Sequence, residues 1–319
     1  VGGGQLRALT VGRQKLRLRG SAMLPLAAIA KLSLLLALTA THAVAVCGVD
    51  VPHAKVSPAS RALDSSDWPE AFPYTAKDLT PMMAGNDGFF YFLPKFVQHA
   101  GEECRDSLTR FYEAVLPASG EGDVLDLCSS WTSHYPSGWR PSPPRRCVAL
   151  GLNPLELLAN PSKTEWRVQD LNKDPQLPYA DAAFDLVTNS LSVDYMTRPL
   201  ELFEETHRVL RPGGLACMAF TNRCFPTKVV PIWTAPFTEA ACSRDTPRIA
   251  HVLGPGREGD GASRLRTVDA PSQASHAKIV GAYFRYSADW AEVGVADVSP
   301  DGWVGQRDPM VVVVARKRG

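Results

Sequence analysis

The chain has 319 residues, of which 45% are hydrophobic and 21% charged, a composition typical of a globular protein. Its length allows one large domain or two smaller ones. The formal net charge of +1 hides an asymmetry, because residues 1–45 hold six basic residues and no acidic one, which leaves 28 basic against 33 acidic residues in the rest. A mildly acidic body argues against a nucleic acid as a partner.

Residues 1–45 have the features of a targeting region. If translation starts at Met23, an apolar stretch ends at the small residues Ala43–Ala45, the pattern of a secretory signal peptide. If it starts upstream, the Arg-rich, acid-free residues 1–22 resemble an organelle transit peptide. The unbroken apolar run Leu32–Ala40 is shorter than the roughly 20 residues of a membrane-spanning helix, so we expect no stable transmembrane span in the mature protein.

The seven cysteines are scattered and form no C-x-x-C pair, which predicts neither a zinc site nor a disulfide framework. An odd, dispersed set favours a reducing compartment. We therefore expect an organelle as the destination, first of all a plastid reached through a secretory-type signal, with secretion or a mitochondrion as the alternatives.

Residues 46–85 hold five prolines and are predicted to be an extended linker. The body, residues 86–319, begins with an amphipathic helix over 94–116 and a strand over 123–127. Residues 136–146, rich in Pro, Ser and Arg, lie where an α/β fold usually has a helix. A polar stretch near 243–277 without hydrophobic period predicts a long insertion.

The remaining elements alternate. Strands are predicted at 147–152, 166–169, 184–189, 215–220, 282–289 and 310–316. A helix starts at Pro154 with Asn153 as its N-cap, and another runs from Pro199 to the Pro212–Gly214 turn. Strands alternating with helices predict an α/β fold with a mostly parallel sheet and helices on both faces.

Four motifs in this order resemble the class I S-adenosylmethionine-dependent methyltransferases, in particular the type 11 group. Val124–Leu127 is similar to the first strand of that family and Gln169–Leu171 to the end of its third. Leu177–Val187 (LPYADAAFDLV) and Glu201–Gly214 (ELFEETHRVLRPGG) resemble its most specific segments. The resemblance implies a three-layer Rossmann-like fold and S-adenosylmethionine as the methyl donor. The cofactor-binding residues that it implies are Asp126, Cys128, Ser129, Ser130, Asn153, Gln169, Asp170, Leu171 and Asn189.

Two departures from the family concern the cofactor. Its first loop follows the pattern D-x-G-x-G-x-G, where glycines let the backbone approach the methionine part, whereas residues 126–132 here contain no glycine. The acid that binds the ribose hydroxyls is expected near Gly151, where Asn153 offers one neutral hydrogen bond instead. Two hypotheses remain open: a methyltransferase acting on a small molecule, or a catalytically inactive relative that serves as a binding or assembly module.

Polar residues at the carboxyl ends of the later strands are candidates for chemistry, because ligands of this fold gather there. Asn222, Arg223 and Cys224 are predicted to contact the substrate, and Arg223 or Lys228 would hold an anionic group. Asp194 and Tyr195 are weak candidates for a catalytic base, since methyl transfer often needs only positioning. Glu204 and His207 have no second copy of their motif, so no metal site is predicted. The oligomeric state stays open.

Overall fold

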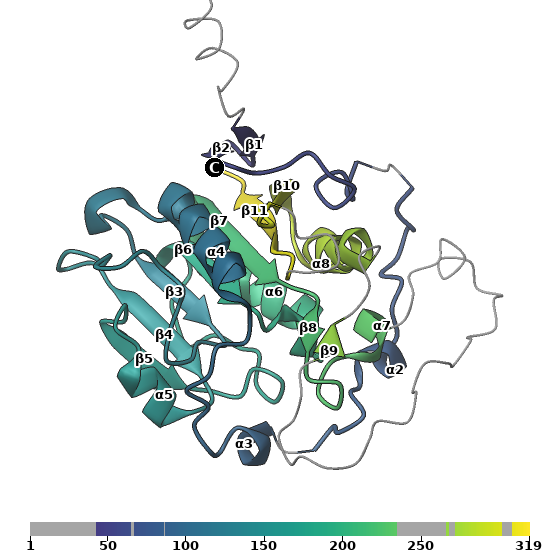
Figure 1. The fold of residues 1–319 in the computed structure, drawn as a ribbon, viewed down its shortest axis with the longest axis horizontal. Helices are drawn as coiled ribbons and strands as arrows, with labels where there is room; N and C mark the ends of the chain where they lie inside the picture. The colour runs from purple at the N-terminus through teal and green to yellow at the C-terminus, as the bar shows by residue number, and fades with distance from the viewer. Residues whose placement is uncertain (1–42, 65–66, 86, 235–265, 268–271, 302–307) are drawn as a thin grey trace, which may run out of the picture. The chain divides into compact units, whose positions relative to one another are not determined.

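The structure, a computed structural model, describes residues 43–64, 67–85, 87–234, 266–267, 272–301 and 308–319 (Figure 1). Residues from His42 onward form one compact unit. The predicted targeting region lies outside the described residues except for 43–45, and most of the predicted insertion at 243–277 does so too. Within the described ranges, no helix is long and apolar enough to cross a membrane.

A seven-stranded sheet in the order β10-β11-β7-β6-β3-β4-β5 forms the centre of this unit (Figure 1). Strands β3 to β7 are mutually parallel, and β11 pairs antiparallel with both β7 and β10. The chain runs outward from β3 to β4 and β5, then returns to place β6 on the other side of β3, so the order reverses between these two strands. The bounds are β3 Val124–Leu127, β4 Cys147–Gly151, β5 Glu165–Val168, β6 Phe184–Ser190, β7 Leu210–Phe220, β10 Trp290–Asp297 and β11 Val311–Lys317.

Both faces of the sheet are covered, and apolar residues of its inner strands are buried on both faces. In β11, Val311 and Val313 pack into one hydrophobic cluster with Phe203 and Tyr283, whereas Val312 and Val314 pack into a second. The first cluster contains helices α6 (Pro199–Val209) and α8 (Ser272–Ser287), and the second contains α4 (Glu102–Val115). The predicted three-layer fold with helices on both faces is confirmed.

Shorter elements complete the described part of the chain. The helices are α2 (Ala76–Leu79), α3 (Asp87–Phe90), α5 (Pro154–Ala159) and α7 (Pro231–Thr234), with single 3-10 turns at Ala118–Gly120 and Val193–Tyr195. Two small sheets pair β1 (Val44–Val46) with β2 (Val49–Val51) and β8 (Arg223–Cys224) with β9 (Arg266–Thr267).

The structure corrects the prediction that residues 46–85 are an extended linker. The β1–β2 hairpin buries Val46 and Val51 in the same cluster as α4, and Ala59, Ala62 and Leu79 belong to the cluster on the other face. The many prolines suggested a linker, and the buried apolar side chains of this segment are too widely spaced to give a recognisable pattern. Residues 46–85 are therefore part of the domain.

Two further boundaries differ from the prediction. The segment 282–289 was predicted as a strand from its apolar residues, but it continues α8, whose Val280, Tyr283 and Phe284 are fully buried. Helix α4 starts at Glu102 rather than at Pro94, and residues 94–101 belong to no helix or strand. The predicted lack of a helix at 136–146 is confirmed, and residues 128–146, which the structure describes throughout, contain no helix at all.

Candidate functional site

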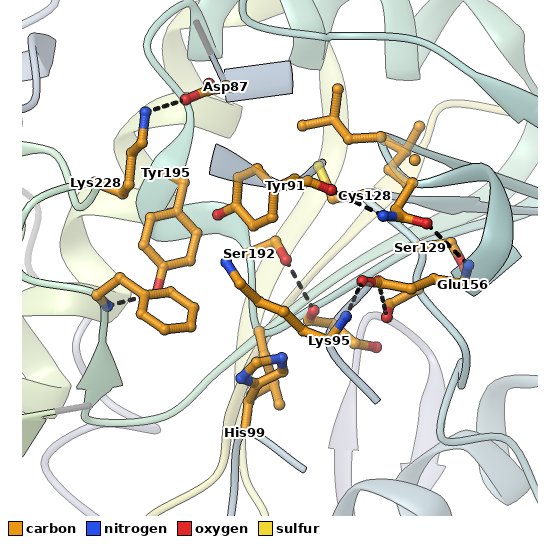
Figure 2. Close-up of a pocket in the computed structure, with 18 of the residues that line it drawn as sticks. Asp87, Tyr91, Lys95, His99, Cys128, Ser129, Glu156, Ser192, Tyr195 and Lys228 are labelled. Carbon is orange, nitrogen blue, oxygen red and sulfur yellow. Dashed lines mark hydrogen bonds and ion pairs between the residues drawn. The ribbon is translucent and has the colours of Figure 1, made fainter. Parts of the chain in front are cut away.

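A pocket opens at the carboxyl ends of β3, β4, β5 and β6, where the strand order reverses (Figure 2). One side, here called the loop wall, consists of residues 126–134 at the end of β3 and after it, all of which except Ser133 line the pocket. Another side, here called the amino-terminal wall, consists of residues 87–99, which precede α4. Residues 169–172 and 190–196 supply most of the remaining lining. Ligands of open parallel sheets bind at this edge, so the pocket is the candidate site.

The loop wall lies tightly against the end of β4. Cys128 has a φ of 55°, a left-handed conformation uncommon for residues other than glycine, and the next amide, of Ser129, donates to the Leu150 carbonyl at 2.7 Å. A Cβ added to Gly151 would lie 2.1 Å from the Ser129 carbonyl oxygen. The position at which the family carries its ribose-binding acid is therefore closed to any side chain in this chain.

Asp126 is the centre of a buried hydrogen-bond network behind the loop wall. Its Oδ2 accepts from the hydroxyls of Ser129 and Ser133, both at 2.6 Å, and its Oδ1 accepts from Thr188 at 2.9 Å. Burial raises the pKa of Asp126 to about 6, although the three hydroxyls oppose the shift. The Nδ2 of Asn160 donates to Ser129 and Ser133 from the other side. Asp126 and Ser129, predicted to bind the cofactor, use their side chains to hold the loop.

Asn153 was predicted to supply a hydrogen bond to the ribose, and the structure contradicts this. Its Oδ1 caps helix α5 by accepting from the amides of Leu155 and Glu156 at 2.9 and 3.2 Å. Its Nδ2 donates to the carbonyls of Tyr91 and Phe92 at 2.9 and 3.1 Å. Both donor hydrogens are used, so Asn153 fastens the amino-terminal wall to α5 instead.

The predicted adenine end, Gln169–Leu171, lines the pocket. Leu171 is buried, while Asp170 accepts from the amide of Asn172 at 3.2 Å and pairs with the Lys173 ammonium at 3.2 Å. The side-chain amide of Gln169 is committed to the carbonyls of Asp174 and Gln176 at 2.9 and 2.7 Å. The Oδ2 of Asp170 has an ion pair but accepts no hydrogen bond from a described residue, so this oxygen and the Leu171 side chain remain available to a ligand, and Gln169 shapes the turn.

Asn189 and Asp194, both predicted site residues, lie outside the pocket lining. Asn189 is fully buried and donates to the Leu127 carbonyl at 3.1 Å, so it supports β3 rather than a cofactor. Asp194 is 3% exposed, and burial raises its pKa to about 8. A carboxyl group in this position has no access to a substrate. Of the two weak candidates for a base, only Tyr195 lines the pocket.

The polar residues after β7 contribute less than predicted. Asn222 and Cys224 do not line the pocket. Arg223 does, but its Nε is 2.7 Å from Asp308 Oδ1, and the Nζ of Lys228 is 2.6 Å from Asp87 Oδ1. Both cations that were predicted to hold an anionic group are already paired.

Sequence reasoning missed the residues of the amino-terminal wall and Glu156. Figure 2 shows Tyr91 beside Cys128, and Lys95 beside Glu156. Glu156, which the sequence presented only as part of a helix start, accepts from the Lys95 amide at 2.6 Å and from the Ser130 hydroxyl at 2.5 Å. The capping-box spacing from Asn153 was the signal for Glu156, whereas the expected helix over 94–116 hid Lys95 and His99.

Comparison with known proteins supports the resemblance. Residues 144–218 match the methyltransferase domain family of type 11. Together with the sheet order, this match supports the class I S-adenosylmethionine-dependent methyltransferase superfamily.

Individual relatives cover part of the domain. An uncharacterized methyltransferase of Mycolicibacterium gilvum is 31% identical over 127 residues, 36% of this chain and 46% of the relative. A malonyl-[acyl-carrier protein] O-methyltransferase of Marinomonas is 28% identical over 127 residues, 38% of this chain and 46% of the relative. The chain thus spans less than half the length of these two relatives. The crystal structure of a Mesorhizobium loti S-adenosylmethionine-dependent methyltransferase aligns with a TM-score of 0.38 at 20% identity, over 65% of this chain and 95% of that one.

The pocket fits a bound S-adenosylmethionine at one end more closely than at the other. Leu171 and Asp170 offer an apolar surface and a carboxylate oxygen at the adenine end. At the ribose end the usual acid is excluded, and Glu156, 7% exposed and lining the pocket, is the carboxylate nearest to the loop residue Ser130. Among the residues that the structure describes, no group of His, Cys, Asp or Glu side chains is arranged to hold a metal ion.

Proposed function

We propose that the chain is a methyltransferase that uses S-adenosylmethionine to methylate a small molecule. The observation that carries the proposal is the pocket at the reversal point between β3 and β6, within a domain of the methyltransferase superfamily. Its lining combines apolar surface with a few polar groups, which is typical of small-molecule sites. The mildly acidic body adds no surface suited to a nucleic acid.

In this proposal Leu171 packs against the adenine and Asp170 accepts a hydrogen bond from its amino group. Ser130 and Glu156 lie where the ribose would be, and the backbone of residues 127–129 borders the methionine part. When bound, S-adenosylmethionine supplies an already activated methyl group on its sulfonium. The chain's own task is therefore to position the two reactants and exclude water.

Tyr195 acts in this arrangement as a hydrogen-bond donor rather than as a base. Its hydroxyl oxygen accepts from the Phe225 amide at 2.8 Å, so the hydroxyl proton points elsewhere. Burial raises the pKa of Tyr195 far above its ordinary value. A tyrosine that stays protonated can orient an oxygen or nitrogen of the substrate but cannot remove a proton from it.

Calorimetric titration of the chain with S-adenosylmethionine and S-adenosylhomocysteine tests the proposal. We expect binding of both, and Asp170→Ala should weaken it about tenfold or more, because one hydrogen bond to a charged group is lost. Asp174→Ala, an exposed acid in the same turn, is the matched control and should bind as the wild type does. No binding at millimolar ligand would refute the proposal and leave the fold as a binding or assembly module.

A further inference from the structure

Cationic groups gather on one side of the pocket, and they differ in how they are neutralised. Lys228 and Arg223 each pair with a carboxylate, Asp87 and Asp308. Lys95 has no carboxylate within ion-pair distance of its ammonium among the described residues. Glu156 binds the Lys95 backbone amide at 2.6 Å rather than the side chain. The Lys95 ammonium is thus the unpaired positive charge of the described pocket lining.

Aromatic rings surround this ammonium. The Nζ of Lys95 lies 3.7 Å from the ring centroid of Phe90, 4.6 Å from that of Tyr91 and 5.2 Å from that of Phe225. Its one printed hydrogen bond goes to the Phe90 carbonyl at 3.3 Å. Ring faces stabilise a cation, but an ammonium has three donor hydrogens, so hydrogen-bonding capacity remains for a ligand.

His99 adds a second unused polar group next to Lys95. The imidazole lines the pocket, packs edge-on against Phe225 with the ring centroids 5.6 Å apart, and makes no hydrogen bond to a described residue. Burial, with a smaller contribution from Lys95, lowers the pKa of His99. A neutral imidazole beside an ammonium offers an N–H donor without a second positive charge.

We propose that Lys95 binds the carboxylate of the methyl-accepting substrate, with His99 as a second donor and the rings of Phe90, Tyr91 and Phe225 against a flat apolar body. A single unpaired cation matches a monoanion such as a carboxylate more closely than a dianionic phosphate. The ammonium lies against Phe225, which follows β7 and β8, and Figure 2 shows Cys128 and Ser129 of the cofactor loop on another side of the pocket. This substrate assignment rests on the proposed methyltransferase function.

The probes for the experiment are benzoate and its uncharged analogue benzamide. Each is titrated calorimetrically into the full chain that has been saturated with S-adenosylhomocysteine. We expect benzoate to bind at least about tenfold more tightly than benzamide, the difference that one charge-assisted hydrogen bond makes. Equal affinity of the two probes, or no binding of benzoate at millimolar concentration, would overturn the proposal.

Variants then test whether the Lys95 ammonium is the group that binds the carboxylate of benzoate. Lys95→Met should weaken benzoate binding about tenfold and leave the affinity for S-adenosylhomocysteine unchanged, whereas Lys95→Arg should retain most of the benzoate affinity. Lys77→Met, which removes an exposed lysine of α2, is the control, and thermal melting verifies that each variant folds.

The outcomes separate this proposal from the one on which it rests. Weaker binding of S-adenosylhomocysteine to Lys95→Met with unchanged benzoate binding would mean that the ammonium serves the methionine carboxylate, and it would overturn the substrate assignment. If the wild type fails to bind S-adenosylhomocysteine but binds benzoate in a Lys95-dependent way, the methyltransferase proposal fails while the carboxylate site stands.

Discussion

The loop wall and the amino-terminal wall border the same pocket, but they differ in whether their polar side chains have bonding partners within the chain. In the loop wall, the side chains of Asp126, Ser129 and Ser133 bond to one another and to Asn160. In the amino-terminal wall, the Lys95 ammonium lacks a carboxylate and His99 lacks a hydrogen bond within the described chain.

The difference shows that polar residue types in a conspicuous motif do not by themselves indicate a binding site. Hydrogen-bonding capacity that the fold has already used stabilises the fold, and only unused capacity is available to a ligand. The loop wall therefore acts mainly as structure, and the amino-terminal wall supplies much of the recognition. Four experiments can break or sharpen this contrast.

The largest expected effect follows from removing the centre of the loop-wall network. Asp126→Ala leaves the hydroxyls of Ser129, Ser133 and Thr188 without their acceptor. We expect the free energy of unfolding to fall by about 3 kcal/mol at pH 5, since buried unpaired polar groups are costly. Urea denaturation measures this change in the free energy of unfolding. Asp126→Asn keeps the shape and one oxygen acceptor and should lose much less. An alanine variant as stable as the wild type would show that the network is dispensable.

The same carboxyl group predicts a pH dependence of stability. In the folded chain the pKa of Asp126 is about 6, whereas the ordinary value of an aspartate is 3.8. Because the folded state binds the carboxyl proton more tightly, the Asp126 contribution to the free energy of unfolding falls as the pH rises from about 4 to about 6. The loss is about 3 kcal/mol. Denaturation curves across this range compare the wild type with Asp126→Asn, which should lack this decline. Parallel profiles would contradict the assignment.

Much of the fold could be predicted from the sequence because local pattern and tertiary packing agree there. Strand 184–190 and helix 199–209 lie close to their predicted positions, since the first continues the motif Leu177–Val187 and the second has a helical period. The predicted turn at Pro212–Gly214 is instead part of β7, which begins at Leu210. The prediction failed at 282–289, where buried aromatic residues favour a strand locally but pack as one face of α8. There, tertiary packing overrides local preference.

The site could be located from the sequence but not resolved. The predicted strand order and the pocket indicate the same edge of the sheet. The sequence could not show that Asn153 uses both of its amide hydrogens on Tyr91 and Phe92. Those partners lie about sixty residues away in the chain, and such pairing depends on the folded arrangement of the amino-terminal wall.

A smaller effect is expected where the loop wall closes the ribose position. Gly151→Ala would place a methyl group against the Ser129 carbonyl, 2.1 Å away before any adjustment. Overpacking of this kind costs about 1–3 kcal/mol, measured as a shift of the urea midpoint. Gly85→Ala is the control, since a Cβ there meets no atom within 4 Å, and it should change stability little. If the two variants have the same urea midpoint, the loop wall moves aside easily, and an acidic residue could be accommodated at position 151.

The smallest expected effect concerns Asn153, the residue that joins the two walls. Asn153→Asp keeps the oxygen that caps α5 but removes both donors to the carbonyls of Tyr91 and Phe92. We expect a loss of about 1 kcal/mol in global stability, concentrated in the amino-terminal wall. Hydrogen exchange should therefore speed up at the Lys95 amide, which donates a hydrogen bond to Glu156 at 2.6 Å. The amides of α5 should stay protected, because the oxygen that caps the helix is retained. Faster exchange in α5 with an unchanged Lys95 amide would show instead that the wall holds its position without Asn153. The charge of Lys95 would then owe its placement to the surrounding aromatic rings and to the hydrogen bonds of Lys95 with Glu156 and Phe90.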